Sequence, residues 1–117
     1  MTRDEILNIP AGYEMDALIL ASVFGVMAFR DEVGRAYKLG AFQENEPVPN
    51  YSGDILSAWA VVEKLGGEDS DYGAHIIGSI NKTWRCIFSN AFVEFSAMEA
   101  TAPLAICRAA LLTTLED

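Results

Sequence analysis

Two short segments combine an aromatic ring with cationic side chains, and this combination could bind an anionic ligand that contains a ring. One segment holds Lys82, Trp84 and Arg85, and the other holds Arg35 and Tyr37. An aromatic ring can stack on a base, while Lys and Arg can pair with phosphates. These five residues form the predicted ligand site. The competing interpretation places Trp84 in the core and Arg85 on a solvated strand face, since large aromatic residues mostly serve packing.

No residue set in the sequence has the pattern of a catalytic or metal site. The chain has one histidine, His75, and no Ser or Cys nucleophile is placed by sequence to pair with it. The acidic residues Glu68, Asp69 and Asp71 lack the later bidentate glutamate of a calcium loop, so they are interpreted as a solvated linker. We therefore expect no enzyme activity, no cofactor and no bound metal.

The two cysteines are interpreted as reduced thiols of the core. Cys86 and Cys107 both lie in apolar segments, and free cysteines are among the most frequently buried residues. A zinc site needs about four ligands, which two cysteines and one histidine do not supply.

The overall charge limits the classes of partner. The chain has 17 acidic and 8 basic residues, which gives a net charge of −9. A general nucleic-acid binder needs a basic face, so neither DNA nor RNA is expected as a partner. The apolar run over residues 17–27 is shorter than the ~20 residues that span a membrane. We interpret it as a core helix of a cytoplasmic protein without membrane contact.

Helix signals occur at the start, middle and end of the chain. Thr2 and Glu5 form a capping box before a short helical turn, and Thr101 with Pro103 has the pattern of a helix start. Further helices are expected over about residues 13–24, 53–65 and 102–115. Ser52 is the predicted cap of the central helix. Its predicted buried stripe consists of Ile55, Trp59 and Val62.

The remaining segments have the pattern of strands and turns. A hairpin is predicted over residues 26–39, a loop over 43–51, and three strands over 74–79, 83–89 and 92–97. Strands joined by tight turns are antiparallel. The sequence therefore predicts one α+β domain over residues 1–117. Its antiparallel sheet is expected to be covered by helices on both faces, as an α/β/α sandwich.

Three blocks of the sequence resemble a known family. They are MTRDEILNIPAGYEMDAL (1–18), PVPNYSGDILSAWAVVEKL (47–65) and TAPLAICRAALL (101–112). In this order they are similar to the phage ABA sandwich domain proteins. The resemblance implies a phage-encoded protein with an α/β/α fold, and it brings no catalytic residues with it.

Two functions are expected from these observations. The first is a non-enzymatic anti-defence sponge that binds and sequesters a nucleotide-derived immune signal. The alternative is a protein that binds a host or phage protein through its surface. A small hydrolase with unrecognised acids is a third hypothesis. A homo-oligomer, a dimer or higher, is also predicted, because half of the chain is apolar and four small helix residues allow close approach: Ala58, Ala60, Ala109 and Ala110.

Overall fold

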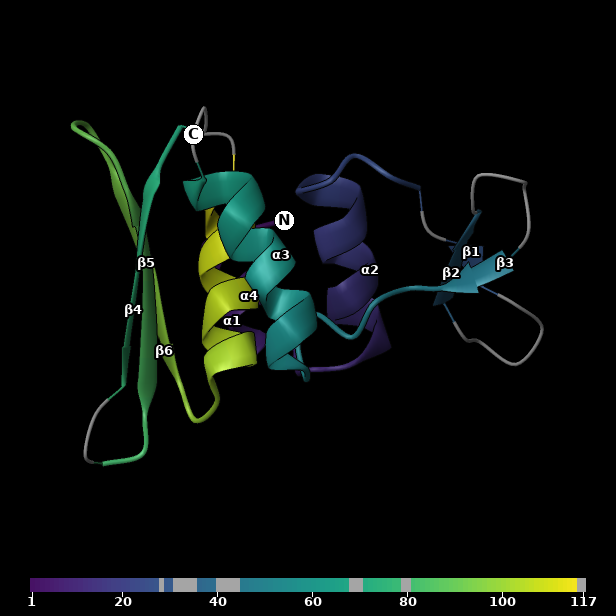
Figure 1. Ribbon diagram of the computed structural model, residues 1–117, viewed down its shortest axis with the longest axis horizontal. Coiled ribbons are helices and arrows are strands. Elements are labelled where there is room, and N and C mark those ends of the chain that lie inside the picture. Colours follow the sequence, from purple (N-terminus) through teal and green to yellow (C-terminus); the bar gives the residue numbers. More distant parts are fainter. Residues whose placement is uncertain (28, 31–35, 40–44, 68–70, 79–80, 116–117) are drawn as a thin grey trace.

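The computed structural model describes residues 1–27, 29–30, 36–39, 45–67, 71–78 and 81–115. In these ranges the chain forms helices and two antiparallel sheets (Figure 1). The helices are α1 (Arg3–Asn8), α2 (Tyr13–Ser22), α3 (Ile55–Gly66) and α4 (Ala102–Thr113). None of these helices is long and apolar enough to cross a membrane.

Local capping fixes where the helices begin. The Thr2 hydroxyl accepts a hydrogen bond from the main-chain N–H of Glu5, and the Glu5 carboxylate accepts one from the N–H of Thr2, which confirms the predicted capping box. Thr101 caps α4 as expected. The cap of α3 is Asp54 instead of Ser52, because the Asp54 carboxylate accepts from the Ser57 N–H at 3.1 Å. The prediction for Ser52 was wrong, and its role is described below.

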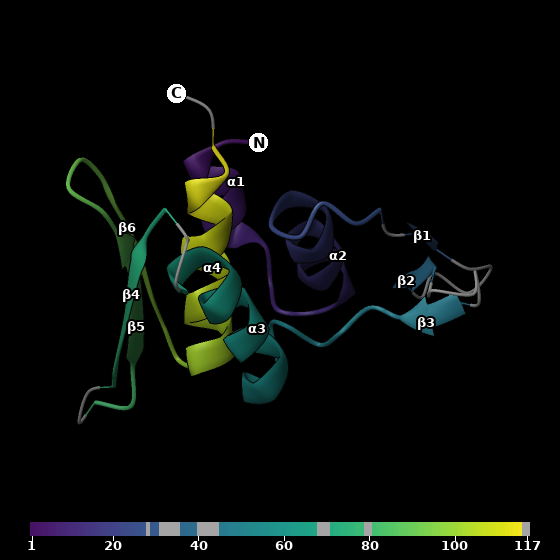
Figure 2. The same cartoon turned by 45° about the horizontal axis from the view of Figure 1, so that its top comes forward.

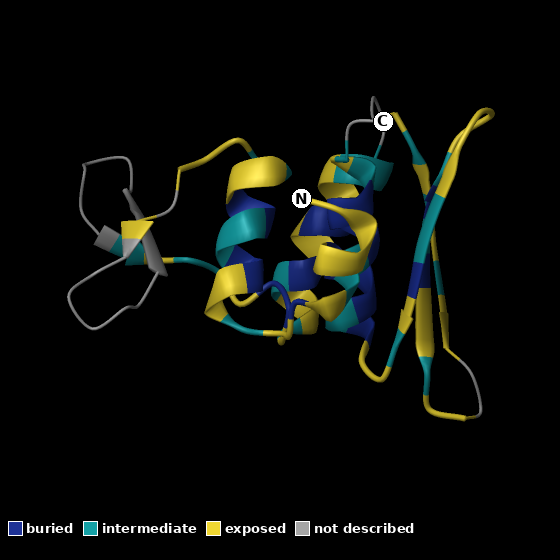
Figure 3. Cartoon of the chain, turned by 180° about the vertical axis from the view of Figure 1, so that it is seen from behind, coloured by how far each residue is buried: buried dark blue, intermediate teal, exposed yellow. Residues whose placement is uncertain are grey.

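Helix α4 is the central element of the core. It packs against α1, α2 and α3 and against all three strands of the larger sheet. Most of its residues are buried, as the dark blue helix in Figure 3 shows. Four of the buried positions are alanine, which lets neighbouring elements approach closely. Two of them, Ala109 and Ala110, were predicted to contact another subunit, as was the fully buried Ala58 of α3; all three pack within the chain.

The larger sheet supplies one wall of this core. It consists of β4 (Gly73–Gly78), β5 (Trp84–Ser89) and β6 (Glu94–Glu99), in that order and antiparallel. Its inner face carries the buried Cys86, Phe88 and Ala97 and packs against α4. An antiparallel sheet with helices packed on it confirms the predicted α+β sandwich class.

Helices were expected on both faces of this sheet, but the described helices cover one face. In Figures 1 and 2, the described helices lie on one side of β4–β6, and no described helix lies on the other side. The predicted hairpin does not join this sheet. Its strands β1 (Phe29–Arg30) and β2 (Ala36–Leu39) pair with β3 (Asn45–Pro47) in a separate sheet beyond α2. Helices α1 and α2 therefore pack against α4 and not against the far face of β4–β6.

Strand β3 falls in the segment that was predicted to be a loop. It forms an edge of the small sheet and ends at Pro47. Proline is tolerated at such an edge because no further strand needs its missing N–H. The predicted loop thus contains a short edge strand, which Pro47 permits.

Helix α3 is rotated relative to the predicted stripe. Its buried residues are Ala58, Val61 and Val62, whereas Ile55 and Trp59 are 48% and 49% exposed. The small Ala58 side chain allows α3 to lie close to the alanine-rich α4. The bulky Trp59 consequently lies at the edge of the contact and not within it.

Candidate functional site: an apolar groove with two tryptophans

An apolar groove with a volume of about 690 Å³ lies between α3, β4, β5 and the start of α4. Ligand sites in proteins commonly have volumes of about 300–1,000 Å³ and mostly apolar walls. Of the described residues, those that line the groove include no charged side chain. They are Ile55, Trp59, Val62, Ala74, Ile76, Trp84, Ala100, Thr101, Ala102 and Pro103.

Two tryptophans on different elements give the groove its aromatic character. Trp59 comes from α3, and Trp84 is the first residue of β5. Their side chains are 49% and 40% exposed, so each ring packs against the protein with part of its surface and leaves the rest free. Partly exposed aromatic rings in a concave site are available for contact with a ligand or partner.

A glycine on the neighbouring strand makes room for the Trp84 ring. Gly78 is the cross-strand partner of Trp84. A β-carbon at Gly78 would come within 3.0 Å of the indole Cζ3 atom and 3.1 Å of Cη2. The ring therefore lies against the bare backbone of β4, and this contact fixes its position at the groove wall.

The structure separates the residues of the predicted ligand site. Trp84 lines the groove, but Arg85 is the next residue of the strand and projects from the opposite face of the sheet. There the Arg85 guanidinium lies 3.7 Å from the Glu94 carboxylate. Lys82 is exposed at the β4–β5 turn with a left-handed backbone (φ 60°).

The other two predicted residues are Tyr37 and Arg35. Tyr37 lies in β2 of the small sheet, on the far side of α2 from the groove (Figure 1). Arg35 lies outside the described residues. Of the four that the structure describes, Trp84 alone lines the groove, and Lys82 lies in the turn that precedes its strand.

The two buried thiols are weakly reactive at neutral pH. Cys86 and Cys107 are free and buried, as the sequence predicted. Burial raises the pKa of Cys86 to about 12 and also raises the pKa of Cys107. Both groups stay protonated at neutral pH, and a thiol is a far weaker nucleophile than a thiolate. Within the described part of the chain, no three side chains form a potential metal-binding cluster.

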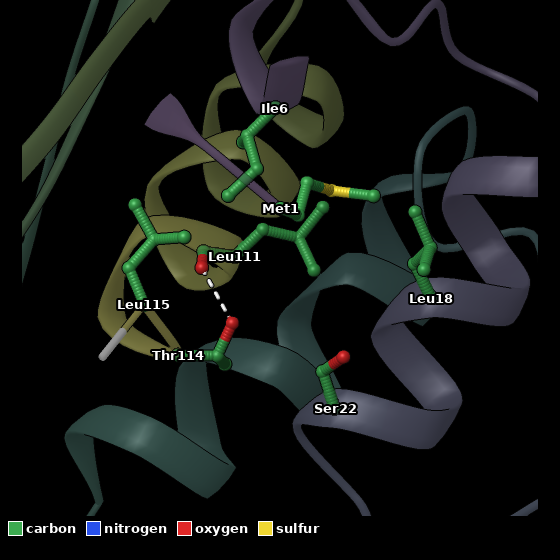
Figure 4. Close-up of a pocket in the computed structure, with 7 residues that line it drawn as sticks. All are labelled: Met1, Ile6, Leu18, Ser22, Leu111, Thr114 and Leu115. Atoms are coloured by element: carbon green, nitrogen blue, oxygen red, sulfur yellow. Dashed lines mark hydrogen bonds between the residues drawn. The ribbon is translucent and has the colours of Figure 1, made fainter. Parts of the chain in front are cut away.

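A second, smaller cavity of about 380 Å³ lies between α1, α2 and the end of α4 (Figure 4). Five of the described lining residues have apolar side chains: Met1, Ile6, Leu18, Leu111 and Leu115. Ser22 and Thr114 also line it, and the Thr114 hydroxyl already donates to the Leu111 carbonyl at 2.6 Å. The apolar groove offers the larger volume and the aromatic rings, so it is the stronger candidate.

The sequence interpretation missed one buried polar contact. Asp16 of α2 is 3% exposed and accepts two hydrogen bonds from Ser52, beside a pocket of about 310 Å³. Burial raises the pKa of Asp16, while the Ser52 hydrogen bonds oppose that rise. The only sequence signal was an acidic residue within the apolar pattern of a helix. Because its partner is a loop residue of the same chain, we assign Asp16 a structural role.

Comparison with known proteins identifies the relatives of this chain. No curated protein matches the sequence significantly. The fold matches the 2.0 Å crystal structure of a phage protein from Bacillus cereus ATCC 14579, with a TM-score of 0.69 and 25% sequence identity. That match covers 89% of this chain and 92% of the other. The family model described as the Phage ABA sandwich domain matches residues 21–111. Because this match spans most of the chain, the protein belongs to the phage ABA sandwich domain family, as the resemblance of its sequence implied.

Proposed function

We propose that this phage protein is a non-enzymatic binding protein whose apolar groove takes the apolar side chains of a protein partner. The observation that carries the proposal is the pair of half-exposed tryptophans, Trp59 and Trp84, in an uncharged groove of about 690 Å³. Tryptophan is enriched among the residues that dominate the binding energy of protein interfaces. Burying these rings under a partner would remove apolar surface from water, which favours association.

The charge around the groove indicates the chemistry of the partner. Glu63 is exposed on α3, four residues after Trp59 and therefore on the same side of the helix. The chain as a whole carries a net charge of −9. An amphipathic partner segment with an apolar face and basic flanking residues would match both the groove and its surroundings.

The test compares two neighbouring residues of α3. Ile55 lines the groove, whereas the adjacent Leu56 is 81% exposed and does not line it. Partners are captured from lysates of the phage host, with and without infection, on four tagged proteins: wild type, Ile55→Ser, Leu56→Ser and Trp84→Ala. We expect a partner that binds wild type and Leu56→Ser and is lost with Ile55→Ser and with Trp84→Ala. A partner that binds all four proteins equally would place the interaction outside the groove.

A nucleotide-derived immune signal is the second candidate ligand, and the protein would then act as an anti-defence sponge. Two indole rings in one groove can stack on a base, and Lys82 precedes Trp84 by two residues. Thermal unfolding with a panel of nucleotides and cyclic nucleotides tests this candidate. A ligand at 100 times its Kd adds about 2.7 kcal/mol of stability. Lys82→Ala and Trp84→Ala should abolish that gain, while Arg85→Ala should retain it, because Arg85 faces away from the groove.

A further inference from the structure

The outer face of the β4–β6 sheet is a second exposed surface, on the opposite side of the sheet from the groove. The described helices lie on the other side of this sheet (Figure 2). Large apolar side chains nevertheless project from the outer face. Ile77 and Met98 are more than half exposed, and Ile87 on the central strand is partly exposed. Such exposed apolar surface on a sheet is typical of an interaction site.

The strand register arranges this face in three rows across the sheet. One row holds Ile77, Arg85 and Met98, which are cross-strand neighbours. The middle row holds His75, Ile87 and Ser96, and the last row holds Gly73, Ser89 and Glu94. One end of the face thus carries three long side chains. The other end carries two small residues and one carboxylate.

We propose that this outer face binds the same face of a second copy of the chain, in a two-fold dimer. The proposed two-fold axis lies midway between the two facing sheets. It runs parallel to the rows, perpendicular to the strands, and passes over the middle row. This rotation reverses the order of the rows, so the bulky row of one copy lies over the small row of the other. Ile77 then lies over Gly73 of the second copy, where no side chain obstructs it. A two-fold interface requires such self-complementarity.

Charge is complementary in the same arrangement. The rotation places Arg85 of each copy over Ser89 of the second copy, whose cross-strand neighbour is Glu94. Within one chain these groups are 3.7 Å apart, and their side chains are 45% and 58% exposed, which is typical of a weak surface pair. The face contains one Arg and one Glu and is neutral overall, whereas the chain has a net charge of −9. Two acidic copies can therefore meet here without strong repulsion.

Two charge reversals test the proposal. Arg85→Glu brings a second carboxylate beside Glu94 of the other copy at each end of the interface, and Glu94→Arg brings a second guanidinium group beside Arg85 of the other copy. Each variant alone should dimerise at least about tenfold more weakly than wild type in sedimentation equilibrium. An equimolar mixture of the two variants restores both opposite-charge contacts between chains and should form a 1:1 heterodimer. In each variant the pair within the chain stays broken, so recovery reports contact between chains.

Lys64→Glu is the matched control. Lys64 is exposed on α3, on the helix side of the sheet, and its substitution changes the net charge as much as Arg85→Glu does. It should leave the dimer intact. Thermal unfolding of each variant verifies that it is folded. A wild-type protein that stays monomeric would overturn the proposal, as would single variants that fail to associate when mixed. A dimer that is insensitive to both reversals would also overturn it.

Discussion

Ser52 donates two hydrogen bonds to the same carboxylate oxygen of Asp16, from its main-chain N–H at 2.8 Å and from its hydroxyl at 2.7 Å. The Ser52 hydroxyl in turn accepts the main-chain N–H of Gly12 at 2.9 Å. Gly12 is the cap of α2, and Ser52 lies in the turn that precedes α3. This buried contact therefore joins α2 to the approach of α3 across 36 residues of sequence.

Removing the Asp16 acceptor should destabilise the protein. In Asp16→Ala, the N–H and hydroxyl of Ser52 lose their partner in a buried site, which costs about 1–3 kcal/mol of unfolding free energy. Asp16→Asn keeps a carbonyl oxygen in the same place and should cost less. Urea unfolding of both variants at pH 7 measures the difference. Equal losses in the two variants would mean that the acceptor contributes nothing beyond side-chain volume.

Asp16 should also give stability a recognisable pH dependence. Burial raises its pKa above the ordinary 3.8, so the folded protein retains this proton to a higher pH than the unfolded chain does. The resulting contribution is fully present below the unfolded pKa and is lost as the pH rises through the folded pKa. The unfolding free energy of wild type minus that of Asp16→Asn should therefore decrease as the pH rises from below 3.8 to 7. A difference that increases over this range would reverse the assigned direction.

The contrast between Thr101 and Ser52 explains how much of the fold could be predicted. Thr101 bonds to an N–H three residues away, so its role is visible in the local sequence. Ser52 has the same kind of side chain, but its partner lies in another helix, and the nearby Asp54 takes the cap. Helix positions and the three strands of β4–β6 follow from local patterns. The separate pairing of the first hairpin depends on contacts between distant segments.

The same distinction applies to the candidate site. Strand alternation implies that Trp84 lies on the side of Cys86 and Phe88 and Arg85 on the other side, and the structure has this arrangement. It could not predict that α3 would leave Trp59 beside Trp84, because the rotation of α3 depends on how closely it packs against α4. The groove is therefore a property of tertiary packing, although each of its aromatic residues could be seen in the sequence.

Alanine substitution of the aromatic residues should distinguish groove residues from core residues by the loss of unfolding free energy. Phe88 is fully buried on the same sheet face as Trp84, and Phe88→Ala should cost about 3–5 kcal/mol. Trp59→Ala and Trp84→Ala should each cost about 1–2 kcal/mol, because much of each ring already contacts water. A Trp59 buried as the sequence pattern predicted would instead cost about 3–5 kcal/mol. Chemical denaturation measures these unfolding free energies. A loss for Trp59→Ala equal to that for Phe88→Ala would contradict the half-exposed position of Trp59.

The buried thiols should make the protein sensitive to alkali. The pKa of Cys86 is raised by burial from 9.0 to about 12. The unfolded chain therefore loses the thiol proton at a lower pH than the folded protein does. Above pH 9 each such thiol should lower the unfolding free energy by up to about 1.4 kcal/mol per pH unit.

Cys86→Ala provides the control for this alkaline effect. The variant lacks one of the two titrating thiols, so its stability should fall less steeply between pH 9 and 11 than that of wild type. Urea unfolding at several pH values, with a reducing agent present, gives both slopes. Parallel slopes would show that Cys86 does not contribute to the alkaline loss.

The central position of α4 has a consequence for how the chain is made. The ribosome produces α4 after every other helix and strand that packs on it, and Arg108 of α4 donates to the Ile9 carbonyl across 99 residues. Until α4 emerges, the apolar faces of α1, α2, α3 and β4–β6 lack their shared packing partner. The nascent chain must therefore carry these faces uncovered through most of its synthesis, a state that favours chaperone binding or aggregation. The packing that unites these elements can form only after α4 has left the ribosome.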